Sequence, residues 1–227
     1  MPAETAPLRR KPVQQRSTRR VERMLSATAE LIEEMGYDGL TTTLIAERAG
    51  VAVGSLYQFF PDKRAVVQEL ALRNLERFVR MISERFEADR PEHWWQAVDT
   101  VFDTYLQMYR EVPAFSRLHF GDVVDLRLLD PGRENNAVIA EKLTELISDE
   151  FGQDPEELAL PLTVAVEAAD AVLHLAFRRD TADGDQPMVA EAKELVRGYL
   201  SSRIPGGGPP PEPAGKSGYP KDLPSPR

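Results

Sequence analysis

The chain has 227 residues, 42% of them hydrophobic, which is enough to bury a substantial core in one large or two modest domains. It contains no cysteine, which excludes disulfides, thiolate nucleophiles and cysteine-based zinc sites and is typical of a reducing compartment. No apolar run approaches the roughly 20 residues of a membrane span, and residues 1–13 lack the apolar stretch of a signal peptide. We therefore expect a cytoplasmic protein that does not contact a membrane.

The net charge of −9 is distributed unevenly along the chain. Residues 1–23 contain seven basic and two acidic side chains, so this segment carries +5 and the remainder carries −14. A basic arm ahead of an acidic body would attract a polyanion at one end and repel it elsewhere. The alternative is a disordered tail that only aids solubility. Either way, we expect a flexible basic arm over residues 1–16.

Helical periodicity dominates the first ninety residues. Apolar side chains recur at three- and four-residue steps over 17–35, and Gly36 supplies a stop. Two short helices are predicted over 43–49 and 54–60, and a long fourth helix is predicted over 62–88. This fourth helix is expected to connect two domains.

Caps and breakers set the expected boundaries of these helices. Thr42 or Thr43 can cap the second helix, and Gly50 ends it in a tight turn. Asp62 can cap the fourth helix. Pro91 sits where a proline at the first position of a fifth helix belongs.

The rest of the chain shows no alternation typical of strands. The pattern predicts, in chain order, a helix over 91–109, a short helix or irregular piece over 113–124, a turn over 130–132, helices over 137–151, 155–177 and 187–202, and a disordered tail over 205–227.

The segment 155–177 is apolar on nearly every face, so it must be covered by its own domain or by a partner chain. We favour a homodimer interface. Glu167, Asp170 and His174 share one face of this helix, where an unpaired charge is costly. They could pair together, recognise a polar ligand group or form a contact across the dimer, and we rank the dimer contact above the ligand contact.

A helix-turn-helix is the motif that points to function. Two short helices joined by a glycine-containing turn let the second helix enter the DNA major groove. The run from Thr41 to Lys63, TTTLIAERAGVAVGSLYQFFPDK, closely resembles the DNA-binding signature of the TetR family of bacterial regulators. The resemblance covers about residues 19–70, with the elements in family order: a long first helix, Gly-Tyr near its end, TTxxIA, AGV, LYxxF and a lysine.

The resemblance implies a set of DNA-contacting residues. These are Thr42 and Thr43 at the start of the second helix, Val53, Gly54, Ser55 and Gln58 facing the groove, and Tyr57 and Lys63 on phosphates. The sequence departs from the commonest family pattern at Ala52, where a serine often caps the recognition helix. It also departs at Phe59, where a histidine often occurs.

These observations predict an all-α protein: an N-terminal three-helix DNA-binding domain with a helix-turn-helix, joined to a larger helical ligand-binding and dimerisation domain. The expected boundaries are 17–63 and 64–204. The resemblance implies a transcriptional regulator that binds double-stranded operator DNA as a homodimer and is released by a small-molecule effector.

The ligand domain offers candidate residues but no transferable motif. A pocket needs apolar walls with a few polar groups that fix orientation. The aromatic and histidine candidates are Trp94, Trp95, Phe102, Tyr105, Tyr109, Phe115, His119 and Phe120. Asp170 and His174 are the polar candidates on the apolar helix. Ordinary core packing explains most of the aromatic residues equally well.

Two other classes of protein, an enzyme and a helical binding bundle, are compatible with parts of the sequence. An enzyme could use His93, His119 or His174, but these histidines are scattered and no catalytic motif is present, so we expect no enzymatic activity, no cofactor and no metal. A helical carrier or protein-interaction bundle could retain the helix-turn-helix as mere structure. The basic arm and the intact Tyr57 and Lys63 argue against that reading.

Overall fold

The computed structural model describes residues 15–115, 118, 129–130, 132–179 and 184–204. Most of the predicted basic arm, the whole predicted tail over 205–227 and most of the 113–124 segment lie outside the described residues.

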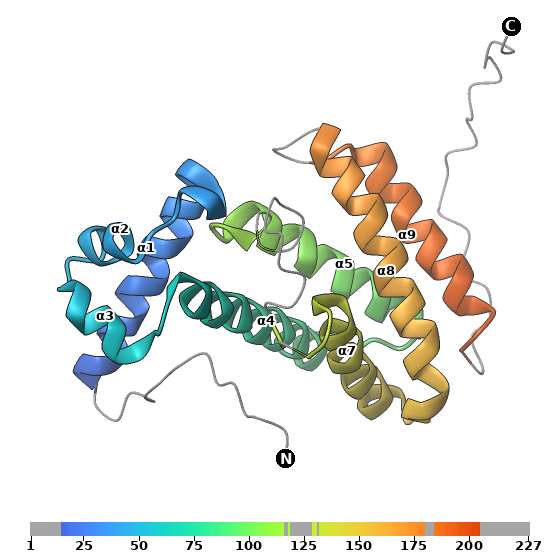
Figure 1. Ribbon diagram of the computed structural model, residues 1–227. Coiled ribbons are helices and arrows are strands. Elements are labelled where there is room, and N and C mark those ends of the chain that lie inside the picture. Colours follow the sequence, from blue (N-terminus) through green and yellow to red (C-terminus); the bar gives the residue numbers. More distant parts are fainter. Residues whose placement is uncertain (1–14, 116–117, 119–128, 131, 180–183, 205–227) are drawn as a thin grey trace, which may run out of the picture.

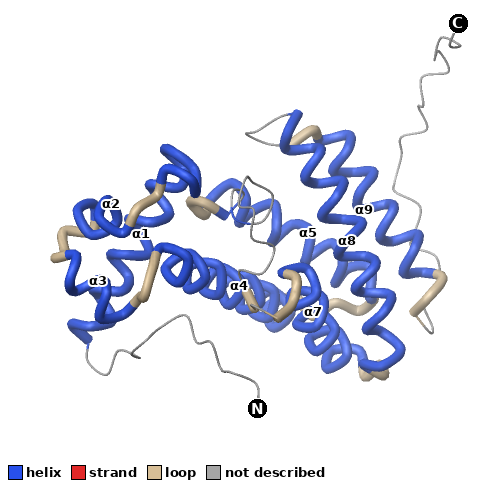
Figure 2. The backbone as a smooth tube through the Cα atoms, in the orientation of Figure 1, coloured by secondary structure: helices blue, strands red, loops and turns tan. Residues whose placement is uncertain are grey.

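The described part of the chain is built from helices, which confirms the all-α prediction. The helices are α1 (Gln15–Gly39), α2 (Thr42–Arg48), α3 (Val53–Phe59), α4 (Lys63–Ala88), α5 (Trp94–Glu111), α7 (Asn135–Phe151), α8 (Pro155–Arg179) and α9 (Gln186–Ser201). Within the same residues no strand occurs, apart from one isolated bridge between Asp130 and Arg133 (Figure 2). That bridge closes the turn predicted at 130–132, in which the Gly132 N–H donates to Asp130 Oδ1 at 2.7 Å.

The helices form two bodies joined by α4 (Figure 1). At one end α1, α2 and α3 pack together, and α1 also packs against α4. At the other end α7 packs against α8, α8 against α9, and α5 against α9 and α4. Helix α4 therefore contributes to both bodies.

Helix α1 follows its predicted apolar period. Val21, Met24 and Ile32 are completely buried, and the Thr28 hydroxyl donates to the Met24 carbonyl oxygen inside the core. Gly36 has φ +72° and interrupts the helical geometry, as the predicted stop requires, although one more turn follows it to Gly39.

The cap of α2 differs from the prediction. Thr41, rather than Thr42 or Thr43, is the N-cap, and its Oγ1 accepts a hydrogen bond from the Leu44 N–H at 3.2 Å. The helix begins one residue earlier than the apolar period indicates, because the cap residue itself carries no periodic signal. Gly50, at φ +62°, then makes the predicted tight turn toward α3.

The starts of α4 and α5 show one correct and one wrong prediction. Asp62 caps α4 as expected, with its Oδ1 accepting from the Ala65 N–H at 2.8 Å. Pro91, in contrast, is not the first residue of α5, which begins at Trp94. The Gln96 side chain reaches back and accepts from the Glu92 and His93 N–H groups, and these bonds fix the later start.

Helix α8 corrects the expectation that no segment is long enough to span a membrane. Residues 155–177 have the length and mean hydropathy, 1.6, of a membrane span. A core helix of a soluble protein passes the same test, so length and composition alone are weak evidence. Here α8 lies between α7 and α9 and carries Leu160, Val164 and Leu175 exposed along its remaining face.

A serine at position 52 should stabilise the DNA-binding body. Ala52 is the N-cap of α3, is exposed and provides no side-chain cap. In Ala52→Ser, the hydroxyl can accept a free N–H of the first turn, which should raise the free energy of unfolding by about 0.5–1 kcal/mol. Urea unfolding followed by circular dichroism measures this change, with Ala52→Gly as the backbone control. A serine variant no more stable than wild type would contradict the assignment of the cap.

Candidate functional site

The α2–turn–α3 unit buries one face of α3 and exposes the other. Leu56 and Phe59 of α3 are buried against the N-terminal core, so Phe59 serves packing at the position where the family pattern often has a histidine. Of the residues predicted to face the groove, Gly54 and Gln58 are exposed on the other side and Ser55 is half-buried, whereas Val53 is half-buried and packs against the core. An added Cβ at Gly54 would meet no atom within 4 Å, so the backbone there is open to close approach.

Tyr57 is held in an outward position. Its side chain is 44% exposed, and its hydroxyl shares a hydrogen bond of 3.0 Å with the Thr42 hydroxyl of α2. Because Thr41 takes the capping role, Thr42 is available for this contact. The bond ties the first turn of α2 to α3 and brings Thr42 and Tyr57 onto one surface, with Thr43 exposed beside them.

Lys63 lies at the start of α4, where the helix dipole favours an anion. Its Nζ donates to the Tyr37 carbonyl oxygen at 3.1 Å and lies 4.5 Å from the centre of the Tyr37 ring. An ammonium has three donors, so this contact positions the group and leaves capacity for a phosphate. Tyr37, the Gly-Tyr tyrosine of the motif, therefore orients the lysine.

Basic side chains also occur at the start of α1. Arg19, Arg20 and Arg23 line a groove together with Glu22 and Glu30 of α1 and with Arg48 and Ala49 at the end of α2. Arg48 is bound to Glu34 by two hydrogen bonds of 2.8 Å, and this contact lowers the pKa of the Glu34 carboxyl. Arg48 thus braces α2 against α1, whereas Arg19 and Arg20 are exposed.

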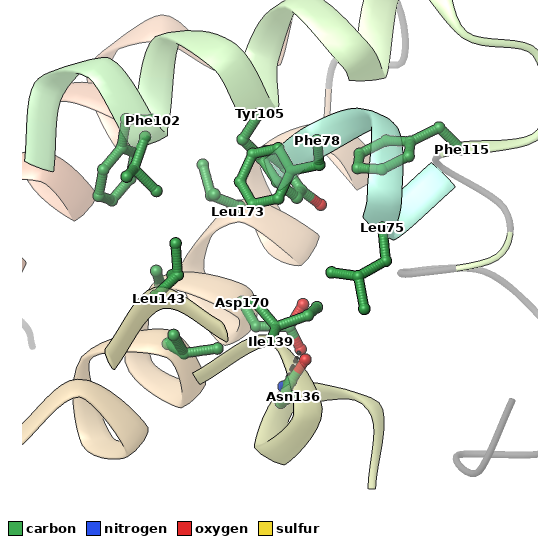
Figure 3. A pocket seen from close by; sticks show the side chains of 13 residues that line it. Leu75, Phe78, Phe102, Tyr105, Phe115, Asn136, Ile139, Leu143, Asp170 and Leu173 are labelled. Carbon is green, nitrogen blue, oxygen red and sulfur yellow. Dashed lines mark hydrogen bonds between the residues drawn. The ribbon is translucent and has the colours of Figure 1, made fainter. Parts of the chain in front are cut away.

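A cavity lies in the second body, between α4, α5, α7 and α8 (Figure 3). The space between these walls, together with the open solvent at its mouth, is about 640 Å³. The walls are mostly apolar, and the described residues that line it are Leu75, Phe78, Val101, Phe102, Tyr105, Phe115, Asn136, Ile139, Leu143, Val166, Ala169, Asp170 and Leu173.

The aromatic side of the cavity is ordered by edge-to-face contacts. The Tyr105 ring lies 6.2 Å from that of Phe78 and 5.3 Å from that of Phe115, both in edge-to-face geometry. Burial raises the pKa of the Tyr105 hydroxyl well above its usual value, with Asp170 as the second cause. The hydroxyl therefore stays protonated and can act as a donor.

The sequence candidates for ligand contact divide into three groups. Phe102, Tyr105, Phe115 and Asp170 line the cavity. Trp94, Trp95, Tyr109 and His174 do not: Trp94 belongs to the core between α5, α8 and α9, Trp95 stacks on His93, and Tyr109 stacks on Phe177 at 3.5 Å between ring centres.

His119 and Phe120 lie outside the described residues. Sequence reasoning missed the α4 and α7 walls, including the polar Asn136, because only the fold brings these helices together.

Family comparisons match both bodies. The family described as "Bacterial regulatory proteins, tetR family" matches residues 24–70, and "Tetracyclin repressor-like, C-terminal domain" matches residues 92–204. The crystal structure of a TetR-family transcriptional regulator from Streptomyces coelicolor is 42% identical, covers 82% of this chain and 99% of its own, and superposes with a TM-score of 0.71.

Curated relatives match over a smaller part of the chain. An uncharacterised HTH-type transcriptional regulator of Mycobacterium bovis is 38% identical over 82 residues, or 34% of this chain and 42% of that protein. The HTH-type transcriptional repressor KstR of Rhodococcus jostii is 41% identical over 58 residues, or 26% of this chain and 27% of that protein. The match thus spans less than half the length of these curated relatives. Together with the two family matches and the Streptomyces structure, it shows that the chain belongs to the TetR family of bacterial transcriptional regulators.

Proposed function

We propose that the protein is a cytoplasmic, homodimeric repressor that binds operator DNA and is released by a small molecule held in the cavity. The observation that carries the DNA-binding part is the α2–turn–α3 unit, which exposes Gly54, Tyr57 and Gln58 over a buried apolar face. In this proposal α3 enters the major groove and reads bases, while Tyr57 and Lys63 hold phosphates on either side.

Electrostatics favour one orientation on DNA. Arg19, Arg20 and Arg23 lie at the start of α1, residues 1–63 carry a net charge of +1, and residues 64–227 carry −10. A polyanion is therefore attracted to the N-terminal body and repelled by the sensor body. This distribution supports binding through the helix-turn-helix surface rather than through any other face.

Tyr57→Phe tests the DNA contact. The ring and its packing are retained, and only the hydroxyl is lost, so affinity for a duplex from upstream of the protein's own gene should fall about tenfold because each subunit loses a hydrogen bond to a phosphate. Fluorescence anisotropy over a salt series measures the affinity and its salt dependence.

Tyr219→Phe, outside the described residues and outside every surface named above, is the matched control and should bind as wild type. Equal affinity of the Tyr57→Phe variant would remove Tyr57 from the interface. Failure of folded wild type to bind any duplex at low salt would favour the helical-bundle alternative.

The homodimer is supported by the uncovered side of α8 and α9. Leu160, Val164 and Leu175 are 70%, 40% and 44% exposed, and their spacing places them along one face of α8. Leu195 of the neighbouring α9 is 50% exposed. Several large apolar side chains exposed on neighbouring helices are typical of a subunit interface, and a two-fold dimer would present two α3 helices to a near-palindromic operator.

Leu160→Lys tests this interface. A buried lysine facing its symmetry mate should disrupt the dimer, and because position 160 is exposed within one chain, the fold itself should be unaffected. Light scattering after size exclusion is expected to give a dimer mass for wild type and a monomer mass for the variant. Met35→Lys, at an exposed position on α1, should remain dimeric. A dimeric Leu160→Lys variant would place the interface elsewhere.

Release by ligand requires coupling between the cavity and α3, and two connections are present. Helix α4 begins beside α3 and supplies Leu75 and Phe78 to the cavity wall. In addition, Glu33 of α1 accepts a hydrogen bond at 2.6 Å from the N–H of Ala114, next to the cavity residue Phe115. A ligand that prefers one position of these elements shifts the population of DNA-binding dimers.

Reciprocity makes this coupling testable without the ligand. If the cavity controls α3, operator binding must in turn alter the cavity. Deuterium exchange with and without operator duplex is expected to show changed uptake in the segments containing Leu75 and Phe115, as well as in α3. A change confined to residues 15–63 would exclude coupling through α4.

A further inference from the structure

Asp170 is an unusual residue for the wall of an apolar cavity. Its side chain projects from α8 toward the space between α4, α5 and α7, and it is half-buried. In Figure 3 it lies with Asn136 on one side of the cavity, and Phe78, Phe102, Tyr105 and Phe115 lie on the other. Among the described lining residues it is the one with a formal charge, since neither lysine nor arginine occurs in that set.

The Asn136 amide orients the Asp170 carboxylate without neutralising it. Asn136 Nδ2 donates at 3.1 Å to Asp170 Oδ2 and also at 3.1 Å to Glu167 Oε2. One neutral amide is thus shared by two carboxylates, so the net charge at this end of the cavity is negative. Burial has the largest effect on the pKa of Asp170 and raises it; the hydrogen bond from Asn136 lowers it, the charge of Glu167 raises it, and His174, one turn further along α8, lowers it.

The ionised Asp170 carboxylate lowers the stability of the folded state. Burial is the largest cause acting on Asp170 and raises its pKa above the ordinary value of 3.8. The groups facing it from α5 and α7 are the Tyr105 hydroxyl and the Asn136 amide, and neither carries a charge that would compensate it. A charge kept in a site where it lowers stability is more simply explained by a ligand than by packing.

We propose that the cavity binds a lipophilic amine, with its ammonium group at Asp170 and its apolar body among the aromatic rings. This inference rests on the proposed ligand-responsive function and adds the chemical class of the effector. The carboxylate supplies a charge-assisted hydrogen bond, and Phe78, Phe102, Tyr105 and Phe115 supply ring faces and edges for an apolar or aromatic body. A carboxylate or phosphate ligand would meet the negative end of the cavity with no compensating cation among the described walls.

Three probes with one skeleton and different head groups test the class. They are 4-phenylbutylamine, a cation at neutral pH, 4-phenylbutanol, which is neutral, and 4-phenylbutyrate, an anion. Calorimetric titration of the full chain without DNA is expected to rank the amine tightest and the acid weakest, with the amine about tenfold or more tighter than the acid.

Asp170→Asn identifies the group responsible. The amide keeps the shape and can still accept from Asn136, but it lacks the charge, so amine affinity should fall about tenfold while alcohol affinity stays within about threefold of wild type. The matched control is Glu167→Gln, which removes the neighbouring carboxylate that shares Asn136 but does not line the cavity. It should leave amine affinity within about threefold.

Stability gives a second readout that separates a recognition role from a structural one. Because the folded-state pKa of Asp170 lies above its unfolded value, the folded state binds the proton more tightly, and stability falls as pH rises between those two values. Asp170→Asn should therefore be more stable than wild type at pH 7, and the difference should shrink as pH falls toward 3.8. If Asp170 instead served packing or ion pairing, Asp170→Asn would lower the free energy of unfolding.

Failure of the proposed ligand class and failure of the proposed regulator give different experimental results. Tighter binding of the acid than the amine, no binding of the amine up to about 5 mM, or an Asp170→Asn variant with unchanged amine affinity would each overturn the proposed ligand class. Because these titrations contain no DNA, such results leave operator binding untouched. Failure of operator binding, in contrast, would overturn the proposed regulator and not the amine site.

Discussion

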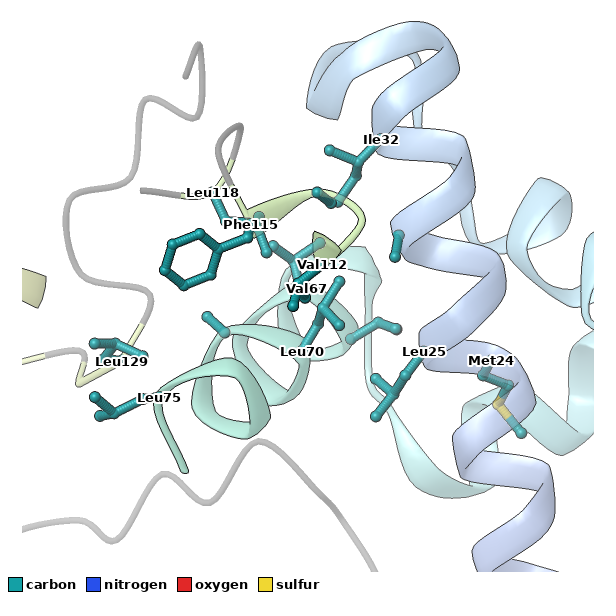
Figure 4. Packing of buried hydrophobic residues seen from close by; sticks show 14 of the residues in the cluster. Met24, Leu25, Ile32, Val67, Leu70, Leu75, Val112, Phe115, Leu118 and Leu129 are labelled. Atoms are coloured by element: carbon teal, nitrogen blue, oxygen red, sulfur yellow. The ribbon is translucent and has the colours of Figure 1, made fainter. Parts of the chain in front are cut away.

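The packing of α1 against the first turns of α4 is the contact on which the rest of the molecule depends. Val67 and Leu70 of α4 face Leu25 and Ile32 of α1 in one continuous hydrophobic cluster (Figure 4). The same cluster continues past Leu75 to the wall of the cavity. Close-packed interiors do not absorb small displacements locally, so a shift of α4 at the cavity must be accompanied by a change at α1 and at the helix-turn-helix it supports.

The segment after α5 reinforces this arrangement from the other side. Ala114 has φ +61°, a left-handed conformation that costs a non-glycine residue about 1–2 kcal/mol. It persists because its surroundings fix it: its side chain is fully buried, and its N–H donates to Glu33 of α1. The neighbouring Phe115 packs against Tyr105 in the cavity wall. The DNA-binding body and the cavity are therefore joined by a hydrogen bond as well as by a helix, and the strained residue lies where the two bodies meet.

Local signals predicted the helices well and their ends less well. Apolar periodicity located α1, α4, α7 and α9 to within a few residues, because each buries one stripe of side chains. The caps depended on geometry that the period does not encode: Thr41 was chosen over its two threonine neighbours, and Gln96 moved the start of α5 past Pro91. For the DNA-facing residues, the family motif supplied positions, and the structure adds the contacts of Thr42 with Tyr57 and of Lys63 with Tyr37.

The cavity was predictable only in part, because four helices far apart in sequence form it. The aromatic residues of α5 were identified by composition, but Trp94 and Phe102 have similar sequence signals and separate only when α5 is rotated into place. The carboxylate on α8 was visible in the sequence as a charge on an apolar helix, where pairing, ligand and dimer explanations were open and a dimer contact ranked above a ligand contact. In the structure the two carboxylates of α8 lie in different environments: Glu167 is exposed, and Asp170 lines the cavity. Asp170 opposes both the apolar pattern of the cavity and the stability of its own site, and this conflict is what supports the proposed recognition role.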